Sequence, residues 1–135
     1  PEFARWPLPN VTLFAGQAAR LRDLLATATP TAEQQADIDW LLALGEMFTL
    51  VVYGQLILEN ATLYSVGADL VEQVFDCLVR DFSHFALTLY GKASTTPEQM
   101  AHCLGMIQKP AVDEERFARV WQTVHSYDGA YEMHP

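Results

Sequence analysis

The sequence predicts an all-α protein, a helical bundle of about five helices of which two are long and central. Apolar residues recur at every third and fourth position through most of the 135-residue chain, which is the spacing of one helix face. Capping residues precede these segments, and Gly or Pro follows them. No segment shows the alternation of a strand. We therefore expect residues 1–135 to form one helical domain.

The first part of the chain is predicted to contain one helix. Pro7 and Pro9 disfavour helix in the residue before each of them, so residues 1–9 are expected to be an extended lead-in. Asn10 is a residue type that caps helices, and the predicted helix runs from there to about Ala28.

The second helix is predicted to be one of the two long ones. Thr31 and Gln34 have the spacing of a capping box, in which the threonine accepts from the glutamine backbone and the glutamine side chain reaches back. From this start we expect a helix over residues 32–64. Gly45 and Gly54 weaken it locally and let another backbone approach closely.

The third helix is predicted over residues 68–90, with Gly91 as its C-cap. The fourth begins after Thr96, where Pro97 occupies the first helical position and Gln99 completes a second capping box.

The fifth helix is predicted to begin after Asp113 and to end near Tyr127, with an apolar stripe along one side. Residues 130–135 are expected to be an irregular tail. The stripe consists of Phe117, Val120, Trp121 and Val124.

The stretch 40–58 carries a single formal charge, Glu46. A helix that is apolar nearly all round needs cover on nearly every side, at the centre of a bundle, against a partner or in a membrane. We expect the other four helices to cover it, which would bury Leu42, Val51 and Leu56, and to leave some apolar surface for a partner.

Four polar residues argue against a membrane span in this stretch, and its flanks lack a basic cluster. They are Glu46, Thr49, Tyr53 and Gln55. A buried Glu46 should pair with a cation or be protonated, and Arg80 in the next helix is the expected partner. The alternatives are a functional acid and simple exposure of Glu46 at a bend.

The net charge of −9, from 17 acidic and 8 basic residues, disfavours binding to nucleic acid and to anionic lipid. No signal peptide is visible, and we expect a cytoplasmic protein. The chain starts at Pro1 without Met, which suggests a segment of a longer protein. Cys77 and Cys103 are expected to be reduced, buried thiols.

No residue pattern here predicts catalysis, and we expect no catalytic, cofactor-binding or metal-binding residues in this segment. A carboxylate-bridged metal site needs two Glu-x-x-His pairs. The chain offers Asp81 with His84 at that spacing and Glu98 with His102 one residue further apart. His125 ends an apolar stripe and is better explained as a helix-terminal cation.

Several strings resemble the C-terminal helical region of long bacterial acyl-CoA dehydrogenases, especially actinobacterial ones, over roughly residues 46–135. The strings are Val52–Glu59, Val79–Ser83, Gly91-Lys92, Ser94–Pro97, Lys109-Pro110 and Gly129–Met133.

This resemblance implies a parent flavoenzyme of fatty acid metabolism, in which FAD lies between domains and a glutamate removes the α-proton of an acyl-CoA. Tyr131-Glu132 matches half of the Tyr-Glu-Gly-Thr string that contacts FAD in that family, but Met133-His134 follow. Neither catalysis nor FAD binding is therefore assigned to Glu132. The implied partners are the catalytic core of the same enzyme and a second copy of the domain.

The alternative function is a helical module that binds a fatty acyl chain or another apolar small molecule. Such a bundle could enclose the ligand between aromatic side chains, although aromatic stripes more often form solid core. The candidate lining is Phe48, Val52, Phe75, Phe82 and Phe85.

Overall fold

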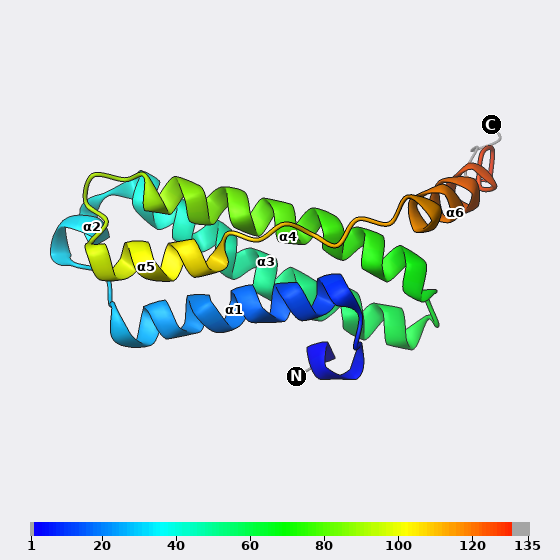
Figure 1. The fold of residues 1–135 in the computed structure, drawn as a ribbon, viewed down its shortest axis with the longest axis horizontal. Coiled ribbons are helices and arrows are strands. Elements are labelled where there is room, and N and C mark those ends of the chain that lie inside the picture. The colour runs from blue at the N-terminus through cyan, green and yellow to red at the C-terminus, as the bar shows by residue number, and fades with distance from the viewer. Residues whose placement is uncertain (1, 131–135) are drawn as a thin grey trace, which may run out of the picture.

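The computed structural model describes residues 2–130, and this range is helical throughout apart from its connections (Figure 1). The all-α prediction is confirmed. The elements are the 3-10 helix η1 (Glu2–Arg5) and the α-helices α1 (Pro9–Thr27), α2 (Ala32–Ala36), α3 (Ile38–Leu63), α4 (Ala68–Tyr90), α5 (Pro97–Met106) and α6 (Glu114–His125). The lead-in prediction is wrong for Glu2–Arg5, and the tail prediction for residues 131–135 lies outside the described range.

Helix α4 holds the bundle together, because it packs against α1, α3, α5 and α6. Its sequence is strongly amphipathic, so one continuous apolar stripe faces the interior. The predicted bounds 68–90 and the Gly91 C-cap are confirmed. The buried apolar residues of the stripe are Val71, Phe75, Leu78, Val79, Phe82, Ala86 and Leu89.

Helix α1 begins at Pro9, two residues earlier than an N-cap at Asn10 implies, and Asn10 is not its N-cap. Leu8 is the N-cap and Pro9 occupies the first turn. Asn10 is fully buried, and its backbone N–H donates to Oε1 of Glu72 on α4 at 2.8 Å. A carboxylate from a neighbouring helix thus accepts from a free N–H in the first turn of α1, while the Asn10 side chain, which was expected to accept from an N–H of that turn, bonds the backbone of Ala111.

The predicted helix over residues 32–64 is two helices, and the prediction of one is wrong. The capping box at Thr31 and Gln34 is present, but α2 ends after five residues. Asp37 has an extended backbone and its carboxylate accepts from the backbone N–H of Trp40 at 3.1 Å. This aspartate is therefore the N-cap of α3.

The two capping boxes contact each other. Nε2 of Gln34 donates to Oε1 of Gln99 at 2.7 Å, and Nε2 of Gln99 donates to Oε1 of Gln34 at 3.0 Å. The same two amides also donate to the backbone carbonyls of Ser94 and Ala28. The amide pair joins the start of α2 to the start of α5, and both glutamine side chains are buried.

We expect Gln34→Ala to lower the free energy of unfolding by about 3 kcal/mol, because it leaves buried amide and carbonyl groups without partners. Chemical denaturation monitored by circular dichroism measures this change. The matched control is Gln35→Ala, whose side chain is exposed on the same helix and should cost less than about 0.5 kcal/mol. Equal losses in the two variants would contradict the proposed role of the amide pair.

The centre of the core is an aromatic cluster around Phe14. Its ring centroid lies 5.3 Å from that of Phe75 and 5.6 Å from that of Phe82, both nearly edge-on. Gly54 of α3 packs directly on this ring, since a Cβ built at Gly54 would lie 2.7 Å from Cε1 of Phe14. A Cβ there would force the Phe14 ring to shift, so glycine fits this position, but the group that approaches Gly54 is an aromatic side chain and not the backbone that was predicted.

Candidate interaction surface

Helix α3 lies on the outside of the bundle, and its expected cover on every side is not present. Leu42 is 59% exposed and Leu56 is 47% exposed, while Val51 is half-buried. The prediction that these residues are buried is wrong for the first two. The reason is geometric: α4 covers the inner face of α3, and no helix within residues 2–130 covers the opposite face.

The exposed side of α3 carries many large apolar side chains. We call its large apolar side chains the outer face of α3; each is at least 40% exposed. An apolar surface of this extent is unusual on a soluble monomer and is typical of an interaction site. The outer face consists of Ile38, Leu41, Leu42, Phe48, Val52, Tyr53, Leu56 and Leu63.

Two hollows flank the outer face at opposite ends and on opposite sides. The first, of about 290 Å³, lies between α1 and the N-terminal half of α3 and includes Gly45 in its lining. The second, of about 420 Å³, lies between the C-terminal half of α3 and the start of α4, and its lining includes Tyr53 and Leu70. Both hollows are lined mainly by apolar side chains, so side chains of a partner could enter them.

The polar residues of α3 do not form the predicted buried pair. Glu46 is exposed, so the predicted pairing with Arg80 is wrong. Nε of Arg80 instead contacts Oδ1 of Asp76, one turn earlier on α4, at 2.6 Å. Gln55 donates to Glu59 along the helix at 2.7 Å. Glu46 is thus a solvated charge at the edge of an apolar surface and needs no cation.

Helix α6 presents a second exposed apolar stripe, and Figure 1 shows it beyond the end of the main bundle. The predicted cap at Asp113 is confirmed. Phe117, Trp121 and Val124 are each more than half exposed. The rings of Phe117 and Trp121 stack with centroids 6.2 Å apart, and the His125 ring lies edge-on to Trp121.

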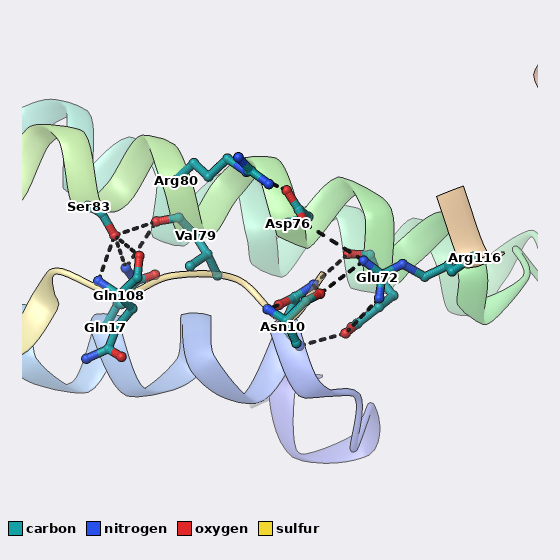
Figure 2. A network of polar contacts seen from close by, with 10 residues as sticks. Asn10, Gln17, Glu72, Asp76, Val79, Arg80, Ser83, Gln108 and Arg116 are labelled. Carbon is teal, nitrogen blue, oxygen red and sulfur yellow. Dashed lines mark hydrogen bonds and ion pairs between the residues drawn. The ribbon is translucent and has the colours of Figure 1, made fainter. Parts of the chain in front are cut away.

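A buried polar network attaches α6 to α4 and α1 (Figure 2). Nη1 of Arg116 lies 3.7 Å from Oε1 of Glu72, and its Nη2 lies 3.8 Å from Oδ2 of Asp76. All three side chains are at least 93% buried. Asn10 completes the network by exchanging hydrogen bonds with the backbone of Ala111.

Further hydrogen bonds hold α6, and the connection that leads to it, in place. Gln17 donates to the backbone carbonyl of Met106 and to that of Val79 (Figure 2). The Ser83 hydroxyl donates to the backbone carbonyl of Gln108 and accepts from its backbone N–H. At the surface, Arg119 of α6 donates to Asp69 of α4 through two nitrogens. The hydrogen bond and charge of Arg119 lower the pKa of Asp69.

The histidines, cysteines and carboxylates that could bind a metal do not lie together in the structure. Within residues 2–130 no three His, Cys, Asp or Glu side chains are placed to hold one metal ion. His84 lies beside the Phe85 ring, and His102 contacts the Thr27 hydroxyl at 3.1 Å. The predicted pairs with Asp81 and Glu98 therefore form no shared metal centre.

The two cysteines are free, and they differ in environment. Cys103 is buried as predicted, and burial raises the pKa of its thiol to about 11. Cys77 is exposed, so the prediction of burial is wrong for it. It lies outside the apolar stripe of α4, on the solvent side of that helix.

The five residues suggested to line an acyl pocket do not surround a common cavity. Phe75 and Phe82 are fully buried in the core cluster, whereas Phe48 and Val52 belong to the outer face of α3. The aromatic stripe of α4 is solid core, which is the more common use of such a stripe.

Among the described residues, α3 is also the one helix with the length and composition of a membrane span, and 22% of its most apolar stretch is buried. Its inner face, however, packs on α4, which carries Glu72, Asp76 and Arg80. Spanning a bilayer would separate this contact and place the core of the bundle in a new environment. The prediction that the chain has no membrane span stays a prediction.

Comparison with protein-family models, curated proteins and solved structures finds no match to this chain.

Proposed function

We propose that the chain is the C-terminal helical domain of an FAD-dependent acyl-CoA dehydrogenase and that it acts as an interaction domain. In this role the outer face of α3 packs against protein surface within the enzyme, either the catalytic core or another copy of the domain. The chain itself contributes no catalytic residue and binds no cofactor. FAD and the reaction belong to the parent enzyme.

The observation that carries the interaction role is the outer face of α3. Its eight large apolar residues are 40% to 72% exposed, which makes an apolar surface of several hundred Å². This is about the area that each partner contributes to a stable protein interface. Leaving it in water would be unfavourable by about 25 cal/mol per Å².

The sequence strings support the choice of parent enzyme. Val52–Glu59 lies on the C-terminal half of α3, and Val79–Ser83 lies on α4 where it meets α1 and the α5–α6 connection. Gly91-Lys92 and Ser94–Pro97 form the turn into α5. These strings therefore lie on the outward helix α3, at the contacts of α4 with α1 and the α5–α6 connection, and at the turn into α5.

The test uses the complete reading frame that encodes this chain, expressed and purified as one protein. We expect visible flavin absorbance and bleaching of that absorbance by acyl-CoA. Oxidative footprinting should show Phe48 and Tyr53, which are 59% and 60% exposed in this chain, protected about tenfold in the complete protein.

Trp121 of α6 is 56% exposed, and its labelling is measured in the same experiment. Unchanged labelling of Trp121 would show that the protection is confined to α3. A complete protein without flavin would reject the assignment to this enzyme family. Phe48 and Tyr53 labelled as strongly as in the isolated chain would reject the interaction role.

A further inference from the structure

Helix α3 has two opposite seams with the spacing of helix packing, and one of them is occupied. On the inner seam the buried residues follow at intervals of three, four and seven, and this seam packs on α4. Outward-facing residues follow at intervals of three and four along the whole helix, as the a and d positions of paired helices do. The outer seam consists of Ile38, Leu42, Gly45, Thr49, Val52, Leu56, Glu59 and Leu63.

Gly45 is the residue of this seam that the chain itself does not explain. A glycine inside a helix is unfavourable relative to alanine. Gly54 is required because a Cβ there would meet the Phe14 ring, whereas a Cβ at Gly45 would meet nothing within 4 Å. Gly45 also lines the hollow beside α1, so its missing side chain leaves room for a side chain from outside.

We propose that the outer seam of α3 binds the α3 of a second copy of this chain, with the two helices antiparallel and crossing between Thr49 and Val52. Leu56 of the second copy then lies over Gly45, in the hollow that Gly45 helps to line, and the reverse contact follows by two-fold symmetry. The inference deepens the proposed function and rests on it in taking this face to be a protein-binding surface.

Charge and area favour this occupant and this direction. In a parallel pair Glu46 would lie near Glu46 and Glu59 near Glu59, whereas an antiparallel pair separates these like charges. The antiparallel arrangement also opposes the two helix dipoles. The apolar residues of the seam and the neighbouring Leu41, Phe48 and Tyr53 of the outer face together supply several hundred Å² from each copy, which is the order of area that one partner contributes to a standard interface.

The test is sedimentation equilibrium of the 135-residue chain over a range of concentrations. We expect a reversible dimer, and we expect Gly45→Leu to weaken it at least about tenfold because the added side chain fills the space for Leu56. The variant should raise the melting temperature of the monomer, since leucine favours helix more than glycine does. A structural defect would lower that temperature.

The matched control is Gly16→Leu on α1, where the glycine is also exposed and also has open space beside it. It should raise the melting temperature similarly and leave the dimer affinity unchanged. A second comparison uses two double variants. One is Leu42→Gln/Leu56→Gln on the outer seam. The other is Leu87→Gln/Leu104→Gln, at leucines of α4 and α5 with similar exposure. Only the first pair should weaken the dimer.

Equal weakening by both glycine variants would overturn the proposed crossing at Gly45. If the wild-type chain stays monomeric, the proposal that a second copy binds the outer seam is wrong. If Phe48 and Tyr53 are then protected in the complete flavoprotein, the catalytic core is the occupant and the proposed function stands. If they are not protected, both proposals fail. A monomer that pellets with phosphatidylcholine vesicles through the same leucines would assign the face to a lipid surface instead.

Discussion

Phe14→Ala is expected to lower the free energy of unfolding by about 3–5 kcal/mol, the largest effect of any single substitution considered for this fold. The Phe14 side chain is fully buried and packs against residues of η1, α3 and α4. Its ring lies within 5.3–5.7 Å of the rings of Phe3, Phe75 and Phe82, and against Gly54 of α3. Truncation would leave a cavity that these rigid neighbours cannot fill.

Urea denaturation measures the loss, and Phe117→Ala is the matched control. Phe117 is 53% exposed on α6, so its removal should cost less than about 1 kcal/mol. A double-mutant cycle with Gly54→Ala locates the effect at the α1–α3 crossing. The Gly54→Ala penalty should shrink when Phe14 is replaced by leucine. A penalty independent of residue 14 would contradict direct contact as its cause.

Arg116→Met is expected to destabilise the protein by about 3 kcal/mol and to loosen α6. The change leaves Glu72 as a buried carboxylate without a cation, while Asp76 keeps its contact with Arg80. Breaking a buried ion pair from one side costs about 3–5 kcal/mol, and the remaining partner of Asp76 places this case at the low end.

Denaturation and hydrogen exchange of the α6 amides measure these two effects. Arg119→Met is the control, because it removes an arginine of the same helix from an exposed pair with Asp69 and should have a much smaller effect. Adding Glu72→Gln to Arg116→Met should recover part of the lost stability, since it removes the unpaired charge. No recovery would show that packing of the arginine side chain, and not charge, holds α6.

Local signals predicted most helix boundaries correctly. The bounds of α4, both threonine-glutamine capping boxes and the Asp113 cap depend on residues within one or two turns of each other, so they can be seen in the chain directly. The break at Asp37 was missed although an aspartate is a common N-cap. The strong capping box at Thr31 and the apolar pattern beyond it suggested one continuous helix.

Long-range contacts account for the other errors. Asn10 has the residue type of an N-cap, but it lies inside the bundle because Glu72, far away in sequence, satisfies its N–H. The predicted ion pair between Glu46 and Arg80 assumed that α3 is buried on all sides. Glu46 is exposed, so the assumption is wrong. The sequence predicted that some apolar surface would remain for a partner. It did not predict that this surface would be the outward side of α3.

The sequence by itself determined that this chain is all-helical, where most helices begin and end, and which stripe of each amphipathic helix is apolar, because these properties follow from local backbone and side-chain preferences. Only the tertiary structure decided which apolar face of α3 is covered. Two opposite faces of that helix are equally able to pack, and periodicity cannot distinguish them. The position of α4 on one side of α3 leaves the other side exposed and makes it the candidate surface for a partner.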